Sequence, residues 1–280
     1  MREIVVGSEA LRSGLLTRGQ LSRQLRVLPD VYAPRGSILS LRDRTLAAWL
    51  WSRRRAVIAG AAAAALHGAR WIDDDTPVEL ILENGRPPKG LIVRNETLAD
   101  AEVTRVAGLP VTTVRRTAFD LARHLPRDPA IARLDALKRA NPFSSEDVEA
   151  LASRHPGAPG LRRLRQALPL VDPGGASPRE TWLRLLIIDA GLPTPTTQIP
   201  VHDTRGLVAV LDMGWEEFKV AAEYDGDQHR SDRRLYVWDQ RRDRLVSCQR
   251  WHVVKVIKED RPAEVVSRID GALRSRGWRP

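Results

Sequence analysis

Two strand-like runs, at residues 208–213 and 218–224, flank a short acidic turn and constrain the fold more than any other feature. The first run carries Asp212 near its end, and the second leads into Glu223 and Asp225, with apolar β-forming residues around all three acids. A buried carboxylate is costly unless it is paired or holds a cation. Side chains alternate along a strand, so Glu223 and Asp225 point the same way, and pairing of the two runs would bring Asp212 to that face. The pattern predicts a β-hairpin with a hard-cation site that suits Mg²⁺.

The ordered set of acids and neighbours resembles the PD-(D/E)XK nuclease superfamily. More narrowly, it resembles the bacterial domains related to very-short-patch repair endonucleases. The matching residues lie in roughly the last hundred positions and are Glu180, Asp212, Glu223, Asp225, Gly226, His229, Tyr236, Asp239 and Arg242. The resemblance implies a restriction-endonuclease-like core that hydrolyses DNA phosphodiesters with Mg²⁺ or Mn²⁺. Asp212, Glu223 and the carbonyl of Tyr224 would be the metal ligands.

The resemblance departs from the wider superfamily at Asp225, where a lysine is usual. The related repair endonucleases use histidines instead, which implies that His229 orients or deprotonates the water or protonates the leaving oxygen. Asp225 would help hold the metal or fix His229, and Lys255 is an alternative basic residue. The expected nucleic-acid contacts are Gln228, Arg230, Arg233, Arg234, Tyr236, Arg241 and Arg242. Tyr236 has a second interpretation, as a brace for the fold.

Glu180 also has two interpretations. It lies three residues after Ser177, with Pro178 at the first helical position, so it can act as a capping-box residue that reaches back to the Ser177 amide. As a family residue it would instead point toward the metal site and belong to the catalytic set.

The turn-rich segment at residues 171–178 is the best candidate linker. We therefore expect one region at residues 1–170 and a second at 179–280. In the second, the predicted order is helix, three strands, helix, strand, helix, as in a restriction-endonuclease core. The first is expected to be mainly helical, with a β-rich section at residues 71–110 and several helices at 112–168. The overall class is α+β.

The first residues have the outline of a small winged helix. Short helices are predicted at residues 8–12 and 17–25, where Thr17 and Gln20 form a capping box, and a strand is predicted at 31–33. We expect the second helix to carry three basic side chains that could meet DNA, and a buried side made of leucines. These residues are Arg18, Arg23 and Arg26, and Leu11, Leu15, Leu16, Leu21 and Leu25. A solvated basic face is the alternative.

Two later segments resemble antitoxins of the abortive-infection AbiEi type. Residues 60–67, GAAAAALH, resemble a small-residue helix of those proteins, and residues 111–122 carry the pattern Arg116, Thr117, Asp120 and Leu121. The resemblance implies a winged-helix region that binds DNA or a partner, such as a cognate toxin or a defence protein.

Charge agrees with contact to a polyanion. The chain of 280 residues has a formal charge of +10, and its basic excess lies before the linker: Lys and Arg outnumber Asp and Glu by 27 to 19 in residues 1–176 but by only 18 to 16 in residues 177–280. An arginine-rich proteome would give the same bias. The single cysteine, Cys248, excludes a disulfide framework. A cytoplasmic location without membrane contact is the default expectation, because no signal peptide is visible and the apolar run at residues 56–66 is too short to cross a bilayer.

Two functions therefore remain open from the sequence. The first is a metal-dependent DNA endonuclease with an N-terminal region for DNA or partner binding. The second is a non-catalytic DNA-binding regulator of the antitoxin type, whose nuclease fold is inactive. The pair of Asp212 and Glu223 favours the first, and the missing lysine at Asp225 favours the second.

Overall fold

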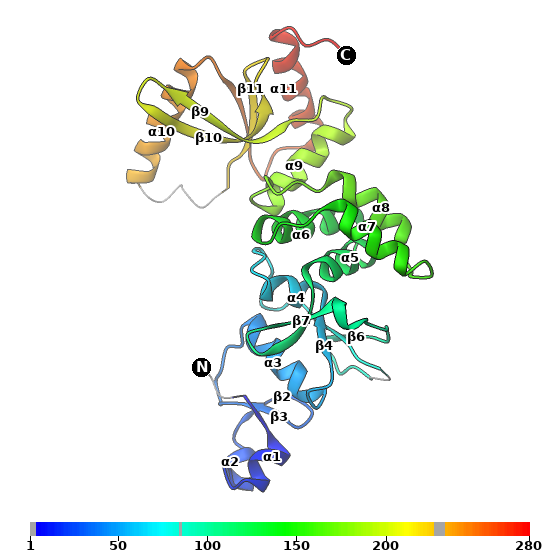
Figure 1. Cartoon of the computed structure of the whole chain (residues 1–280). Helices are drawn as coiled ribbons and strands as arrows, with labels where there is room; N and C mark the ends of the chain where they lie inside the picture. The colour runs from blue at the N-terminus through cyan, green and yellow to red at the C-terminus, as the bar shows by residue number, and fades with distance from the viewer. Residues whose placement is uncertain (1–3, 84–85, 227–232) are drawn as a thin grey trace. The chain divides into compact units, whose positions relative to one another are not determined.

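The computed structural model describes residues 4–83, 86–226 and 233–280, and for residues 233–239 it describes the main chain only. The chain forms two compact units, Met1–Val171 and Asp172–Pro280, which we describe separately. Both units combine sheets with helices, so the fold is α+β as the sequence predicts (Figure 1). A membrane-spanning helix is not found in the described part of the chain.

The first unit begins with a small helix–hairpin domain. Its elements are β1 (Val5–Val6), α1 (Gly7–Arg12), α2 (Arg18–Leu21), β2 (Leu25–Leu28) and β3 (Val31–Ala33). The strands form an antiparallel sheet in the order β1-β3-β2. The predicted capping box is present, because the Thr17 side chain accepts from the Gln20 amide and the Gln20 side chain accepts from the Thr17 amide. Two short helices followed by a hairpin agree with the winged-helix outline.

The second helix is much shorter than predicted, which corrects two expectations. Leu25 and Arg26 belong to strand β2, where they pair with Ala33 and Tyr32, so of the three arginines only Arg18 is on the helix. Leu15 and Leu25 are exposed, at 54% and 39%, and do not form a buried side. The helical spacing is misleading here, because α2 ends at Leu21 after about one turn and strand β2 begins at Leu25.

A five-stranded sheet follows, in the order β6-β5-β4-β8-β7. Its strands are β4 (Val57–Ala59), β5 (Val78–Ile81), β6 (Leu91–Arg94), β7 (Val103–Val106) and β8 (Leu109–Thr112). Helices α3 (Leu41–Trp51) and α4 (Gly60–Leu66) pack against it, and η1 (Asp100–Glu102) is a short 3-10 turn. The N-terminal unit therefore has more helix than strand, as predicted, and its strands form two sheets. The apolar run at residues 56–66 divides into strand β4 and the buried alanine helix α4, where small side chains allow close packing.

A helical layer completes the first unit. It contains α5 (Val114–His124), α6 (Arg127–Ala140), α7 (Ser145–Arg154), α8 (Leu161–Ala167) and the 3-10 turn η2 (Leu168–Leu170). Helix α5 is central, because it contacts α4, α6, α7 and α8. Thr113 and Ser144 cap α5 and α7 with their side chains.

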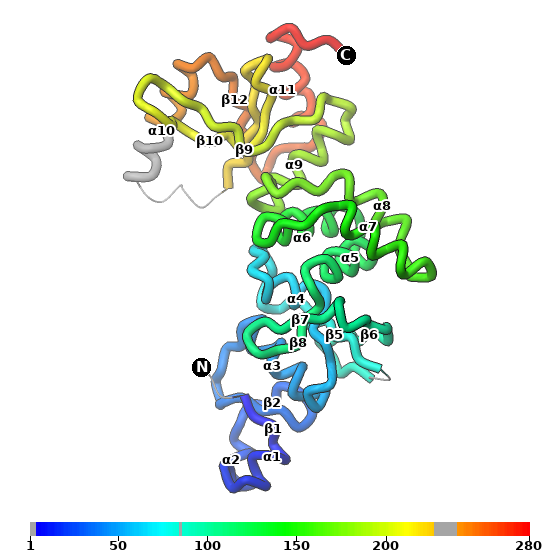
Figure 2. Tube along the Cα trace, viewed as in Figure 1, coloured from blue at the N-terminus to red at the C-terminus, as the bar shows by residue number. Residues whose placement is uncertain are grey.

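The second unit has the predicted order of elements. They are α9 (Pro178–Asp189), β9 (Thr196–Asp203), β10 (Gly206–Trp215), β11 (Val220–Tyr224), α10 (Arg233–Cys248), β12 (His252–Val256) and α11 (Pro262–Ser275). Strands β9, β10 and β11 form an antiparallel meander, and the crossover through α10 places β12 parallel to β11. Figure 2 traces β9, β10 and β12 of this unit. One apolar cluster joins the sheet to α9 and α11, and a second joins it to α10 through Val246. The sheet is thus covered on both faces.

Candidate functional site

Two of the three acidic residues predicted to share a sheet face, Asp212 and Glu223, lie opposite each other in the C-terminal hairpin. Met213 pairs with Ala222, so one step along the antiparallel ladder sets Asp212 opposite Glu223. The carboxylate of Asp212 accepts the Tyr224 N–H at 2.9 Å. The predicted convergence of Asp212 and Glu223 therefore agrees with the register of β10 and β11.

Asp212 has the most perturbed acid–base environment of this group. Burial and the negative charges of Glu180 and Glu223 together raise the pKa of Asp212 to about 7, against the opposing effects of the Tyr224 N–H and Arg242. Glu180, in the first turn of α9, is therefore within electrostatic range of the hairpin acids. Near neutral pH, Asp212 is balanced between its charged and neutral forms.

The charge of Glu223 is matched by an arginine. Arg242 on α10 donates through Nη1 to Glu223 at 3.1 Å, and its Nη2 bonds the second carboxylate oxygen and the carbonyl of Val210. Bonding to Glu223 raises the pKa of Arg242. Lys255 is the register neighbour of Glu223 on β12, but its ammonium group pairs with Asp243. A guanidinium group, rather than the alternative lysine, therefore neutralises Glu223.

Glu180 also has a structural role. Its N–H donates to the Ser177 hydroxyl at 3.2 Å, and its side chain accepts the Ala176 N–H at 3.0 Å. The cap thus exists, although the side chain reaches the amide of Ala176 rather than the Ser177 amide that we expected. Within the described ranges, no three His, Cys, Asp or Glu side chains are grouped to hold a metal ion. Glu223 is bound by Arg242 and Glu180 caps α9, so both carboxylates would have to exchange these contacts to bind Mg²⁺ or Mn²⁺.

The other predicted residues of this region are placed only in part. Asp225 is exposed, and its N–H donates to the Val256 carbonyl at 2.8 Å. The Tyr224 ring packs edge-on against Trp182, with ring centroids 6.3 Å apart. Gln228, His229 and Arg230 lie outside the described residues, as do the side chains of Arg233, Arg234 and Tyr236 on α10; Arg241 is exposed. Their predicted roles stay predictions.

Basic side chains cluster on the helix–hairpin domain. Arg18 on α2, Arg23 after it and Arg26 on β2 are all exposed, and none of the three has an ion-pair partner in the part of the chain that the structure describes. Asp30, in the β2–β3 turn, accepts from the Ser8 N–H and hydroxyl at 2.9 and 2.6 Å, which fixes the hairpin to the start of α1. Arg54 forms a bidentate ion pair with Glu9, in which each of the two hydrogen bonds is 2.6 Å long. This pair connects α1 to the segment that follows α3. The free arginines therefore sit on a braced scaffold.

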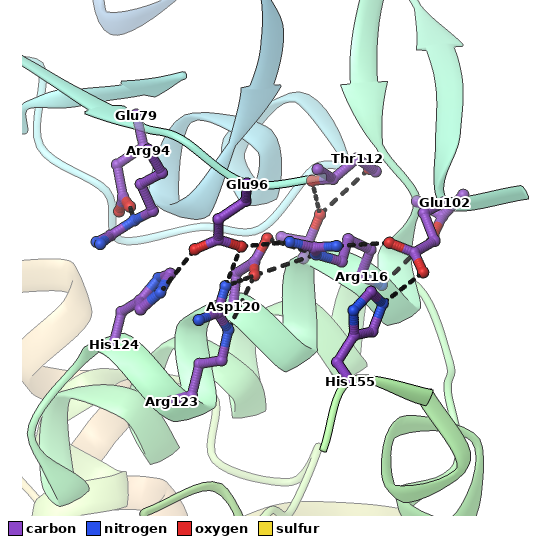
Figure 3. A network of polar contacts seen from close by, with 12 residues as sticks. Glu79, Arg94, Glu96, Glu102, Thr112, Arg116, Asp120, Arg123, His124 and His155 are labelled. Carbon is purple, nitrogen blue, oxygen red and sulfur yellow. Dashed lines mark hydrogen bonds and ion pairs between the residues drawn. The ribbon is translucent and has the colours of Figure 1, made fainter. Parts of the chain in front are cut away.

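A buried cluster of charges surrounds helix α5 (Figure 3). This α5 ion cluster consists of Glu96, Glu102, Arg116, Asp120, Arg123, His124 and His155. Arg116 is 1% exposed, yet its guanidinium group meets Asp120 at 3.1 Å and Glu96 at 2.6 Å, and also bonds Glu102. Arg123 bonds Asp120 at 2.9 Å and contacts Glu96. Buried charges persist only when they are paired in this way.

The cluster strongly perturbs its carboxyl groups. Burial opposes the charged form of Glu96, but bonds from His124 and Arg123 outweigh it and hold the pKa of Glu96 far below its usual range. The pKa of Glu102 is also lowered: burial opposes its charged form, but hydrogen bonds from Arg116 and from His155 Nε2, which lies 2.8 Å from Glu102 Oε1, outweigh burial. Burial raises the pKa of Asp120, although both arginines favour its charged form. The cluster therefore links a loop, the 3-10 turn η1, α5 and the end of α7 electrostatically.

A cavity of about 630 Å³ opens beside the α5 ion cluster. Its lining comes from residues 93–97, from Arg116, Phe119 and Arg123 on α5, and from residues 155–159. Cavities of this size are typical of ligand sites. The two guanidinium groups also lie over the Phe119 ring, at 5.3 and 4.7 Å from its centroid.

Comparison with known proteins places the chain among its relatives. The family model for the AbiEi antitoxin C-terminal domain matches residues 55–170, which contain the five-stranded sheet, α5 and the α5 ion cluster. Two uncharacterized proteins of Mycobacterium tuberculosis, MT2308 from strain CDC 1551 / Oshkosh and Rv2248 from strain H37Rv, are each 31% identical over 271 residues. Each match covers 93% of this chain and 96% of the relative. The chain belongs to their family. No solved structure matches it.

The family match supports the AbiEi resemblance drawn from residues 60–67 and 111–122. It gives no support to the nuclease resemblance of the C-terminal unit. The motif residues Arg116, Thr117 and Asp120 are now explained, because Arg116 and Asp120 form the centre of the ion cluster and the Thr117 hydroxyl bonds that of Thr112 at 2.7 Å.

Sequence reasoning missed the other members of the cluster, which are Glu96, Glu102, Arg123, His124 and His155. One signal was available in α5, since Arg116, Asp120 and Arg123 are spaced by four and three residues and so share a helix face. Glu96, Glu102 and His155 come from distant segments, and only the fold brings them to α5.

Proposed function

We propose that this chain is a DNA-binding regulator of the antitoxin type, in which the helix–hairpin domain at residues 4–33 contacts DNA. The observation that carries the proposal is the set of exposed arginines on that domain, which have no ion-pair partner among the described residues. The same unit matches the AbiEi antitoxin family at residues 55–170. Arginine side chains without carboxylate partners are ready to bind phosphate oxygens or base edges.

The shape of the domain also supports DNA contact. Arg18 starts α2, and Arg26 lies on the adjacent strand, so helix and hairpin offer charge from two elements. The Asp30 contact to α1 and the Glu9–Arg54 pair restrict movement of these elements. A rigid scaffold loses less conformational freedom when it binds a duplex.

The proposal includes a protein partner of the toxin class. Its support is the description of the matching family as an antitoxin. A partner would bind within residues 55–170, which match the family, whereas DNA would bind the helix–hairpin domain at residues 4–33.

The test is a binding measurement with a labelled DNA duplex taken from upstream of the chain's own coding region. The test variant replaces Arg18, Arg23 and Arg26 by alanine. The control variant replaces Arg261, Arg276 and Arg279, which are exposed in the second unit, so that both variants lose equal charge. The proposal expects the first variant to lose most of its affinity and the control to retain it. Equal loss in both would show that charge alone, without this site, explains the binding.

A metal-dependent DNA endonuclease is the second candidate. The observation that favours it is the proximity of Glu180 and Glu223 to Asp212, since burial and these two negative charges raise the pKa of Asp212 to about 7. Incubating the protein with plasmid and Mg²⁺ or Mn²⁺, beside an Asp212→Asn variant, tests it. Nicking by the wild type that the variant loses would establish the hydrolase, and absence of nicking with retained duplex binding would leave the regulator.

A further inference from the structure

Helix α3 ends in a tight turn at residues 52–55, which we call the α3 turn. The Arg53 N–H donates to the Leu50 carbonyl at 2.9 Å, and the Arg54 N–H donates to the Trp49 carbonyl at 3.0 Å. These two bonds form a Schellman motif, in which the first residue beyond the cap adopts a left-handed backbone. That residue is Arg53, with a φ of 57°. The turn therefore holds an arginine in a conformation that favours glycine.

Other helices of the chain show which residue this motif favours. Helices α4, α9 and α11 end with the same pair of bonds, and their left-handed residues are Gly68, Gly191 and Gly277. Helix α10 shares the arginine, as Arg250 with a φ of 64°. A non-glycine residue in this conformation costs backbone strain. The motif itself therefore gives no reason for an arginine, and the surroundings of Arg53 decide what its side chain does.

Ion pairing accounts for the neighbour of Arg53 but not for Arg53 itself. Arg54 also has a positive φ, 63°, and its guanidinium group forms the bidentate ion pair with Glu9 on α1. The negative end of the helix dipole favours a cation in this turn, but Arg54 and Arg55 already supply it. The side chain of Arg53 is exposed and has no hydrogen-bond or ion-pair partner in the part of the chain that the structure describes. Its charge is therefore available to an external anion.

The α3 turn continues the basic surface of the helix–hairpin domain. Helix α3 packs against all three strands of that domain, and the Glu9–Arg54 pair fixes the turn to α1. Hydrogen bonding to Arg54 lowers the pKa of Glu9 despite desolvation, and the charge of Arg12, the last residue of α1, adds to the effect. Arg12 is exposed and therefore lies near the α3 turn, and residues 13–17 separate it from Arg18 at the start of α2. Exposed arginines thus extend from α2 through α1 to the α3 turn.

The charge of this surface is strongly positive when every residue is counted. Residues 4–33 and 52–55 contain seven arginines and two acidic residues, a net charge of +5. The acidic residues are Glu9, which Arg54 neutralises, and Asp30, which accepts from Ser8. Guanidinium groups match the geometry of phosphate oxygens, and a surface of one sign attracts a polyanion. The chemistry therefore fits the backbone of a nucleic acid.

We propose that the α3 turn is a second DNA contact, in which Arg53 binds a backbone phosphate beside the site formed by Arg18, Arg23 and Arg26. This inference rests on the proposed DNA binding by the helix–hairpin domain and extends its footprint. The Glu9–Arg54 pair fixes the turn to α1, so both contacts belong to one scaffold that loses little freedom on binding. A phosphate contact carries no sequence information, so Arg53 adds affinity for any duplex equally.

The test is duplex binding by the full-length protein, measured at several salt concentrations and with two unrelated sequences. The test variant is Arg53→Asn, because asparagine tolerates a positive φ and carries no charge. It should bind both duplexes about five- to tenfold more weakly, which is the size of one lost charged hydrogen bond. The slope of log affinity against log salt should decrease in magnitude by about 0.9. Its melting temperature should not fall, which excludes unfolding as the cause.

Arg250→Asn is the matched control, since it makes the same substitution in the same motif and removes the same charge at the end of α10. It should keep the wild-type affinity and salt slope. Wild-type binding by Arg53→Asn, or an equal loss in Arg250→Asn, would overturn the inference. If the alanine variant of Arg18, Arg23 and Arg26 loses binding while Arg53→Asn keeps it, DNA binding by the domain stands and the second contact alone fails. Absence of duplex binding by the wild type would overturn both.

Discussion

Replacing Arg116 by methionine should destabilise the first unit strongly. Methionine keeps a long unbranched side chain but removes the guanidinium group that bonds Asp120, Glu96 and Glu102. Removing one partner of a buried ion pair typically costs about 3–5 kcal/mol, because an uncompensated charge remains. Asp120 keeps its bond to Arg123, so we expect the lower end, about 3 kcal/mol.

The neighbouring residue supplies the control. Arg115 is 62% exposed on its side chain and pairs with Asp147 at 3.3 Å, so Arg115→Met should cost no more than about 1 kcal/mol. Hydrogen exchange of peptides from α5, measured at increasing urea concentrations, gives the free energy of unfolding of the first unit separately from that of the second. The loss should be smaller at pH 5 than at pH 8, since Asp120 without Arg116 has a still higher pKa and becomes neutral more readily.

Equal effects of Arg116→Met and Arg115→Met would refute this reasoning. It would mean that the buried charges contribute no more than an exposed pair. If Asp120→Asn in the same chain does not reduce the loss, the uncompensated charge of Asp120 is not its cause.

Three further predictions follow from single contacts. The pKa of Asp212 is about 7 in the folded protein against 3.8 ordinarily, so between these two pH values the folded state binds a proton that the unfolded state has lost, and the free energy of unfolding falls as pH rises. Asp212→Asn should therefore stabilise the second unit by about 3–4 kcal/mol at pH 8 and have little effect at pH 4, as measured by urea unfolding at both pH values. Gly160 has a φ of +88° and a Cβ there would lie 2.2 Å from the Arg123 carbonyl, so Gly160→Ala should lower the melting temperature, whereas Gly157→Ala, with open space around it, should not. Thr17→Ala should cost about 1 kcal/mol by removing a capping bond, and Thr17→Ser should restore it.

The second unit was largely predictable from sequence. Its strands are apolar runs separated by turn residues, and Ser177 and Pro178 mark the start of α9. The order of elements therefore agreed with expectation. The pairing of Arg242 with Glu223 was not predictable, because the spacing of 19 residues along the chain says nothing of which side of α10 faces the sheet.

The first unit was harder to predict for a physical reason. Its strands are only two to four residues long, so their periodicity is too brief to separate from helix, as at Leu25 and at the apolar run before α4. The α5 ion cluster joins Glu96, Arg116 and His155 across separations that no local pattern reveals. The AbiEi-like motif marked Arg116 and Asp120 correctly but gave no sign of their partners.

The salt dependence of duplex binding tests the central claim most directly. If Arg18, Arg23 and Arg26 bind phosphates, the slope of log affinity against log salt for the wild type should exceed that of the triple alanine variant by about 2–3, because each lost phosphate contact removes a little less than one unit. Equal slopes for the wild type and the triple variant would contradict the assignment of DNA binding to the helix–hairpin domain.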